Sequence, residues 1–162
     1  MTPEQADSLR ATLLTQRVAA LGTLHDAQPF VSMVPYALVA GGAGLVIHVS
    51  QLAAHTRDMQ LHPQVSMLVM APPTAGTPPQ ALPRVTIQGE AERLAEDDAL
   101  YPAARAAYLE RFADSAPMFG FGDFSLFVIR PVSLRLVGGF AQARTLGPDD
   151  LVAALAEAGG QR

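Results

Sequence analysis

The sequence predicts an α+β fold, a small barrel of about six antiparallel strands with flanking helices. Apolar segments of strand-like length and composition outnumber the segments with helical spacing. The strands also do not alternate regularly with crossover helices, which argues against a doubly wound parallel sheet. Closing an antiparallel sheet into a barrel removes its exposed edges, so the barrel is the favoured arrangement.

The length and composition indicate one globular domain. The chain has 162 residues, of which 49% are hydrophobic and 16% charged, and this excludes a disordered chain. We expect a single domain over 1–162, with the barrel at about 17–140. No apolar run approaches the roughly 18 residues of a membrane span, and the start lacks a signal-peptide pattern. The sequence therefore predicts a cytoplasmic protein without a membrane partner.

Two residue types are absent, and their absence excludes several kinds of chemistry. There is no Cys, which excludes disulfides, thiolate zinc sites and cysteine nucleophiles. All 11 basic residues are Arg, so a lysine Schiff base and a Walker-type phosphate loop are excluded as well. The net charge is −4 and no basic stripe is visible, so we expect no nucleic-acid partner.

The first half of the chain begins with a helix and continues with strands. Thr2 and Gln5 form a capping box around Pro3, and this predicts a helix at about 3–16. Four strands follow, at Val18–Leu24, Phe30–Leu38, Leu45–Val49 and Val65–Met70. Pro35 lies inside the second strand and points to an edge or a bulge, and the apolar run of the fourth predicts burial on both faces.

The connections between these strands are short. His25–Gln28 is predicted to form a turn, and the glycine-rich segment Ala40–Gly44 a hairpin turn rather than a phosphate cradle, because it opens no helix. A short helix is expected at about Ala53–Leu61, ended by Pro63.

The second half opens with a proline-rich loop at 71–83, a length typical of functional lids or mobile linkers. A strand follows at Arg84–Leu94 and a helix at Asp97–Phe112. Two further strands, Phe124–Arg130 and Val132–Gly138, are hinged at Pro131. The chain then has one more predicted helix at about 148–158.

Several strings in this order resemble the pyridoxamine-phosphate-oxidase-like FMN-binding proteins. The opening hairpin, Val18–Leu24 followed by Pro29–Tyr36, is similar to theirs. The sharpest match is the string from Ser50 to Met59, followed by His62–Ser66, which resembles the haem-utilisation (HugZ/HutZ-like) branch of that superfamily. The strings Arg84–Ala91 and Val137–Ala143 extend the similarity, so that it covers about 10–145.

The resemblance implies a homodimeric split β-barrel of the FMN-binding type, with FMN held between the subunits. FMN would lie along the strand Ser32–Tyr36, with its phosphate over the segment Ser50–Arg57. The cofactor-binding residues that we predict on this basis are Ser32, Met33, Val34, Tyr36, Val49, Ser50, His55, Thr56, Arg57 and Arg84. A helix start with hydroxyls and an Arg suits an anion, because free N–H groups and a guanidinium fork both bind phosphate.

Each of the polar site residues also has a purely structural interpretation. Ser50 would serve as a helix cap, Thr56 would fill space, and His55 and Arg57 would lie at the surface. Arg84 would be a charge at the start of a strand. His48, His55 and His62 recur every seven residues, but two helical turns separate the last two, so we expect no metal site.

The sequence departs from true pyridoxamine 5'-phosphate oxidases, and the departures limit the function. Ser32 stands where those oxidases have an Arg, Ala54-His55 where they have Arg-Lys, and the chain has no Trp. Oxidation of vitamin B6 is therefore the least favoured hypothesis. The haem-utilisation proteins use a histidine of the C-terminal region as haem ligand, whereas the last histidine here is His62.

Two hypotheses follow. The first is an FMN-dependent oxidoreductase or reductase acting on a small molecule that the sequence does not name, with the cofactor supplying the redox chemistry. The alternative is a non-enzymatic haem- or flavin-binding module related to haem utilisation. Turnover of NAD(P)H favours the first, and capture of haem without turnover favours the second.

Overall fold

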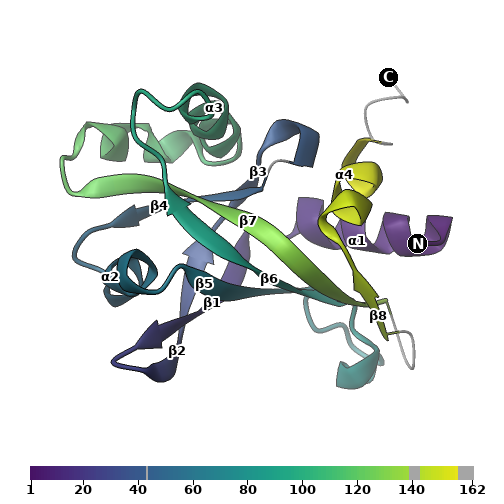
Figure 1. The fold of residues 1–162 in the computed structure, drawn as a ribbon. Helices are drawn as coiled ribbons and strands as arrows, with labels where there is room; N and C mark the ends of the chain where they lie inside the picture. Colours follow the sequence, from purple (N-terminus) through teal and green to yellow (C-terminus); the bar gives the residue numbers. More distant parts are fainter. Residues whose placement is uncertain (43, 139–142, 157–162) are drawn as a thin grey trace.

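The fold is known from a computed structural model, which describes residues 1–42, 44–138 and 143–156. Its eight strands form one antiparallel sheet that curls into a half-barrel (Figure 1), in the order β2-β1-β5-β6-β7-β4-β3, with β8 paired to β7. The strands are β1 Val18–His25, β2 Gln28–Pro35, β3 Ala37–Leu38, β4 Leu45–Ser50, β5 Gln64–Met70, β6 Arg84–Arg93, β7 Phe124–Val137 and β8 Ala143–Leu146. The α+β class predicted from the sequence is confirmed.

Helices pack on both faces of this sheet. The α-helices are α1 Pro3–Thr15, α2 Ala54–Leu61, α3 Tyr101–Arg111 and α4 Pro148–Ala156, and the 3₁₀ turns are η1 Ala40–Gly42, η2 Pro79–Ala81 and η3 Ala113–Gly120. Figure 1 shows α1 beside α4, and Arg10 of α1 donates to the carbonyl of Ala154 at 2.9 Å. None of the helices in the described residues is long and apolar enough to cross a membrane.

Two local signals define the first elements as expected. The predicted capping box is formed, since Gln5 N–H donates to Thr2 Oγ1 at 3.3 Å and Thr2 N–H to Gln5 Oε1 at 2.9 Å. The β1–β2 hairpin closes at Asp26 and Ala27, which have φ values of 49° and 60°. Both values lie in the left-handed region, as a two-residue type I′ turn requires.

The core consists of two clusters that lie on opposite faces of the sheet, because successive residues of β4 and β7 belong to different clusters. The larger cluster, centred on residues such as Leu21, Ile47 and Ile87, is covered by α1 and α4. The smaller cluster packs Val46, Leu126 and Val128 under α3, with Tyr108 of that helix among them. Burial of this apolar surface supplies most of the favourable free energy of folding.

Some sequence predictions are corrected by the tertiary structure. The two strands expected around Pro131 form one continuous strand, β7, because a β-bulge accommodates Val132 as an extra residue between Pro131, opposite Gly89 of β6, and Ser133, opposite Gln88. The predicted strand Phe30–Leu38 is broken after Pro35, because the residues up to Pro35 pair with β1, whereas Ala37 and Leu38 pair with β4. The helix expected from Asp97 begins only at Tyr101, and the edge strand β8 was not expected.

The burial predicted for β5 is also wrong for the single chain. Val65, Met67 and Val69 are buried, whereas Leu68 and Met70 are 38% and 42% exposed. The side chains of β5 therefore alternate between the core and a second face of the sheet, which we call the outer face. Two segments named from the sequence lie partly outside the described residues. These are the string Val137–Ala143, at 139–142, and the last predicted helix, at 157–158.

Candidate functional site

In Figure 1, α2 lies beside the β1–β2 hairpin, and polar side chains of these elements are joined there by hydrogen bonds. Ser32 Oγ of β2 and Nδ1 of His55 lie 3.0 Å apart in a hydrogen bond, which joins two of the predicted site residues. Burial lowers the pKa of His55, and the charge of Asp58 opposes this lowering only in part. At neutral pH the ring of His55 is therefore uncharged, and it contributes a polar contact rather than a cation.

The hydroxyls of Ser50 and Thr56 are used within the chain. Thr56 is fully buried and donates to the carbonyl of Ser50 at 2.6 Å. Ser50 in turn donates to the carboxylate of Asp123 at 3.0 Å and accepts the N–H of Leu52, while the cap position of α2 is Ala53. A phosphate at this point would meet the Asp123 carboxylate, so these contacts do not favour the predicted phosphate position.

The two arginines predicted to grip phosphate lie apart in the chain. Arg57 is exposed on α2, close to the start of β5, whereas Arg84 pairs with Met70 at the other end of β5. The length of that strand separates them by about 20 Å at roughly 3.3 Å per residue. Arg84 donates to the carbonyls of Gln80 and Leu82, so within this chain it closes the 71–83 loop.

The remaining predicted residues divide between the core and the outer face. Val34, Tyr36 and Val49 are buried, and the hydroxyl of Tyr36 donates to the carbonyl of Leu13 at 2.8 Å. Burial raises the pKa of Tyr36 to about 12, although Arg111 beside it acts in the opposite direction. Met33 is 62% exposed on the outer face. Contact of these four residues with a flavin stays a prediction.

A second polar group at α2 was not expected from the sequence. The Asp58 side chain is buried, accepts from Thr23 Oγ1 at 2.8 Å and lies 2.8 Å from Nδ1 of His25. Burial acts to raise the pKa of Asp58, but the hydrogen bonds from His25 and Thr23 and the charge of Arg57 outweigh it and hold the pKa below its ordinary value. Asp58 is therefore an ionised carboxylate held between a helix and a hairpin.

This pair opens on a surface cleft between α2 and the hairpin. The cleft has a volume of about 330 Å³. The residues that line it, together called the α2 cleft, are Leu24, His25, Asp26, Arg57, Asp58, Leu61 and His62. The only sequence feature that singles out residues of this cleft is their type, because two of the four histidines of the chain, His25 and His62, line it. Nothing local indicated that His25 would meet Asp58, 33 residues away.

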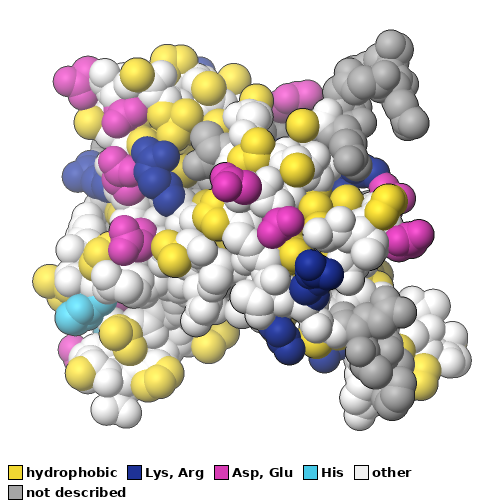
Figure 2. All heavy atoms as spheres, turned by 45° about the vertical axis from the view of Figure 1, so that its right-hand side comes forward, with side chains coloured by type: hydrophobic (Ala, Val, Ile, Leu, Met, Phe, Trp, Pro, Cys, Tyr) yellow, Lys and Arg dark blue, Asp and Glu magenta, His cyan; other side chains and the backbone are white. Residues whose placement is uncertain are grey.

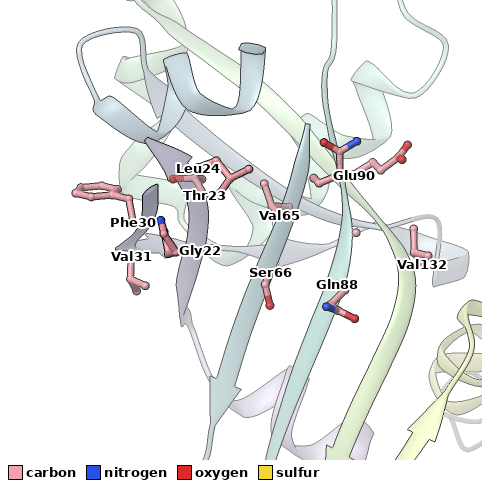
Figure 3. Close-up of a pocket in the computed structure, with 13 residues that line it drawn as sticks. Gly22, Thr23, Leu24, Phe30, Val31, Val65, Ser66, Gln88, Glu90 and Val132 are labelled. Atoms are coloured by element: carbon pink, nitrogen blue, oxygen red, sulfur yellow. The ribbon is translucent and has the colours of Figure 1, made fainter. Parts of the chain in front are cut away.

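A larger hollow lies on the outer face of the sheet (Figure 3). Its volume is about 490 Å³, and its walls come mainly from apolar residues such as Leu24, Val31 and Val132. Figure 3 shows Val31, Ser66 and Gln88 on one side of the sheet, as cross-strand pairing requires, with Gly22 between Val31 and Ser66. Because Gly22 has no side chain, it leaves the floor of the hollow open.

His48 lies in a different environment, under α3. Its ring is stacked on Phe119 with centroids 3.9 Å apart and meets Tyr108 at 5.7 Å and Phe124 at 5.1 Å. Burial lowers the pKa of His48 to about 4, and its Nδ1 has no hydrogen-bond partner within the described residues. Among those residues no group of three or more His, Asp or Glu side chains is arranged to hold a metal ion.

Charge on the surface is mixed. Figure 2 shows acidic and basic side chains interspersed among hydrophobic ones on the face in view. A protein that binds nucleic acid through its backbone charges needs a basic patch or stripe. Among the residues described, that face presents no continuous basic field of this kind.

Known proteins similar to this chain agree on one family. Residues 5–138 match the family described as pyridoxamine 5'-phosphate oxidase. The chain is 37% identical over 119 residues to the non-canonical haem oxygenase HOZ, chloroplastic, from Arabidopsis thaliana, covering 74% of this chain and 35% of that protein. It is 31% identical over 144 residues to the haem oxygenase HutZ from Vibrio cholerae, covering 88% of this chain and 78% of that protein.

A solved structure agrees with these relatives. A haem-binding protein from Mycobacterium smegmatis has a TM-score of 0.83 and 32% identity, covering 94% of this chain and 62% of that one. This likeness confirms the split-barrel fold. The chain spans about a third of the length of the plant relative and less than two thirds of the mycobacterial protein.

Proposed function

The chain belongs to the pyridoxamine 5'-phosphate oxidase family, and on this premise we propose that it is a haem-binding protein. The observation that supports this best is the agreement among its relatives. Two curated relatives at 37% and 31% identity are named haem oxygenases, and the mycobacterial structure is named a haem-binding protein. They favour the haem-binding alternative over the FMN-dependent oxidoreductase.

The residues of the chain suit haem, which presents an apolar ring system, two carboxylates and an iron atom that accepts a ligand. The outer-face hollow has mainly apolar walls, which suit the ring, whereas the α2 cleft, which shares Leu24 with it, is lined mainly by polar and charged side chains. The chain has no Cys and therefore no thiolate ligand for the iron, so a nitrogen ligand would come from one of its four histidines. Bound haem would supply redox-active iron, while the chain would bind and orient the ring.

The test is a titration of the purified full chain with ferric haem. We expect a saturable Soret band that differs from that of free haem, with one haem per chain at the endpoint. A difference spectrum that grows linearly without saturation contradicts the proposal. Loss of the Soret band after addition of a reductant in air would extend the proposal to the oxygenase activity for which HOZ and HutZ are named.

FMN is the second candidate, and one specific contact favours it. The Ser32–His55 hydrogen bond places two polar side chains on β2 and α2, where the family resemblance implies a flavin. If Arg57 and Arg84 hold the phosphate, replacing either by Ala weakens FMN binding by about 1.5–3 kcal/mol. This loss corresponds to roughly 10- to 150-fold in Kd.

Riboflavin, which lacks the phosphate, serves as the control ligand and should bind equally to the wild type and both variants. Arg130→Ala is the control variant, because Arg130 pairs with the exposed Glu92 at 2.7 Å on the surface. FMN binding that is unchanged in both Arg57→Ala and Arg84→Ala contradicts this placement of the phosphate.

We also propose a homodimer formed through the outer face. Val18, Val31, Met33 and Val132 are 46–68% exposed, and Leu68 and Met70 add to the same surface. A second copy would cover this apolar area in an isologous contact. Light scattering should give twice the mass of 17.1 kDa for the wild type and for Val31→Thr, and the monomer mass for Val31→Glu. A monomeric wild type at micromolar concentration contradicts the dimer.

A further inference from the structure

We propose that the outer-face hollow binds the ring of haem without supplying a ligand for its iron, so that the chain binds iron-free porphyrins as tightly as haem. This proposal rests on the haem binding proposed above and adds the site and the class of ligand. The shape of the hollow and the kinds of side chain that line it support it.

A row of side chains across four strands forms the floor of the hollow (Figure 3). Gly22 of β1 pairs with Val31 of β2 and with Ser66 of β5. Ser66 in turn pairs with Gln88 of β6. Three strand spacings separate the ends of this row, which is therefore about 14 Å long. Its two middle residues are short and its end residues are longer, so the floor is a broad, shallow trough that suits a flat ring.

Apolar side chains surround this trough. Val31 and Val132 are 68% and 61% exposed, and Leu24 and Phe30 are each 38% exposed. A bound ring would remove their surface from water, which favours binding. Phe30 also adds an aromatic ring, and aromatic rings stack favourably on other π systems. The walls therefore suit the macrocycle itself, whatever lies at its centre.

The hollow lacks the kinds of side chain that bind haem iron. In proteins this iron is held by His, Cys, Met or Tyr. Among the described residues that line the hollow, none is of these four types. Contacts with the ring, and not a bond to iron, therefore decide the affinity at this site.

The four histidines of the chain are engaged elsewhere. His25 is turned toward α2, where it contacts Asp58. His62 lines the α2 cleft and not the hollow. His48 is stacked on an aromatic ring under α3, and His55 shares a hydrogen bond with a hydroxyl of β2. None of them lines the hollow.

Charge in the hollow does not distinguish haem from an iron-free ring. Glu90 is the one charged side chain among the described residues that line it. A carboxylate repels the propionates of a porphyrin, so these groups should point away from Glu90 and toward the open side. Haem and protoporphyrin IX carry the same two propionates, and the repulsion is therefore equal for both.

The test compares protoporphyrin IX, the haem ring without iron, with ferric haem as ligands of the full chain. Protoporphyrin IX is titrated by its own fluorescence, and ferric haem is then added as a competitor. We expect complete displacement, with values of Kd that agree within about threefold. An affinity for haem that is more than about tenfold higher means that the chain ligates the iron, and it overturns the proposal.

Two substitutions test the position of the ring. Gly22→Val fills the trough, and a Cβ there lies 3.4 Å from the carbonyl oxygen of Ser66, which is an ordinary contact. Leu24→Ser removes part of an apolar wall. Both should weaken the two porphyrins by the same factor, about tenfold for the first variant and about threefold for the second. Val31 and Val132 are left unchanged, because they also belong to the surface proposed for the dimer.

Ala20→Val is the matched control. Ala20 lies two residues from Gly22 on the same face of β1 but does not line the hollow, so both affinities should stay as in the wild type. Circular dichroism and light scattering show whether each variant keeps the fold and the mass of the wild type. Leu24→Ser lies outside the proposed dimer surface, so it tests the site even if Gly22→Val changes that mass.

A second measurement concerns the iron itself. Without a ligand from the chain, the iron of bound ferric haem should take up added imidazole, with a shift of the Soret band. Replacing each histidine in turn, as His25→Ala, His48→Phe, His55→Ala and His62→Ala, should leave the affinity for haem unchanged. If one of these variants loses about tenfold in haem affinity and binds protoporphyrin IX as before, that histidine is a ligand and the proposal is wrong.

The outcomes separate the two proposals. If the wild type binds neither porphyrin, haem binding fails and the site fails with it. If it binds haem but not protoporphyrin IX, haem binding stands and only the ring-based site is overturned. If it binds both equally, and Gly22→Val and Leu24→Ser bind them like the wild type, the ring lies outside the hollow and the assignment of the site is overturned.

Discussion

His25 and His48 both lie on strands of the same sheet, yet their surroundings have little in common. His25, at the end of β1, is partly exposed and hydrogen-bonded to the Asp58 carboxylate. His48, within β4, is 8% exposed among aromatic rings and has an unpaired Nδ1. The first ring is held with a nitrogen turned toward a cleft, and the second is an aromatic packing element. Position in the fold, not residue type, therefore decides what each histidine can do.

The largest expected effect concerns pH and His48. Its pKa falls from 6.5 to about 4 on folding, so the unfolded chain binds more protons than the folded one between these values. Stability should be full above pH 6.5 and should fall as the pH drops toward 4, by up to about 3 kcal/mol. Urea unfolding at pH 7 and at pH 4.5 measures this.

His48→Phe should remove most of this pH dependence of the unfolding free energy. The remainder is due to His55, whose lowered pKa acts in the same direction. The pKa of Asp58 is also lowered, but its contribution is lost only as the pH falls below about 3.8 and through its folded value. If the unfolding free energy changes equally between pH 4.5 and 7 in the wild type and in His48→Phe, His48 is not the source of the pH dependence.

The next effect concerns the carboxylate behind His25. Asp58→Ala leaves the hydroxyl of Thr23 and Nδ1–H of His25 without their acceptor, at a cost of about 1–3 kcal/mol in unfolding free energy. Asp26→Asn is the control, since Asp26 lies near the same ring but is 93% exposed, and it should cost less than about 0.5 kcal/mol. Equal losses in the two variants would mean that the buried contact does not stabilise the fold.

The hairpin that presents His25 allows a stabilising substitution. Ala27 has a φ of 60°, a conformation that costs an L-residue with a Cβ roughly 1–2 kcal/mol. Ala27→Gly should therefore raise the unfolding free energy by about 1 kcal/mol, and Ala27→Val should lower it. Thermal unfolding of the three proteins checks the order, and a destabilised glycine variant would refute the left-handed turn.

The smallest effect is expected at the contact between Ser32 and His55. Ser32→Ala removes one partly buried hydrogen bond and should cost about 0.5–1 kcal/mol. Ser66→Ala on the outer face serves for comparison, because no hydrogen bond of its side chain occurs within the described residues. Denaturant midpoints that shift equally for both would show that the contact with His55 contributes no stability.

Elements that depend on neighbouring residues were predicted well from the sequence. The capping box at Thr2 and Gln5 and the turn after His25 act over a few residues, and both are present. Elements that depend on distant pairing were not. The edge strand Ala143–Leu146 has little apolar pattern of its own and exists because β7 offers an unpaired edge. The split expected at Pro131 disappears because β7 keeps its pairing with β6 through a bulge at Val132, next to the proline.

The candidate site divides in the same way. The sequence by itself determined that nitrogen ligands must come from four histidines, that no thiolate is available, and that polar residues cluster from Ser50 to Asp58. Only the tertiary structure decided which of these side chains meet. Ser50 turned to Asp123, Arg84 to the carbonyls of its own loop, and Asp58 to His25 across 33 residues. The physical reason is that a buried polar group must find a partner wherever the packed chain provides one, and that partner is set by the fold and not by spacing along the sequence.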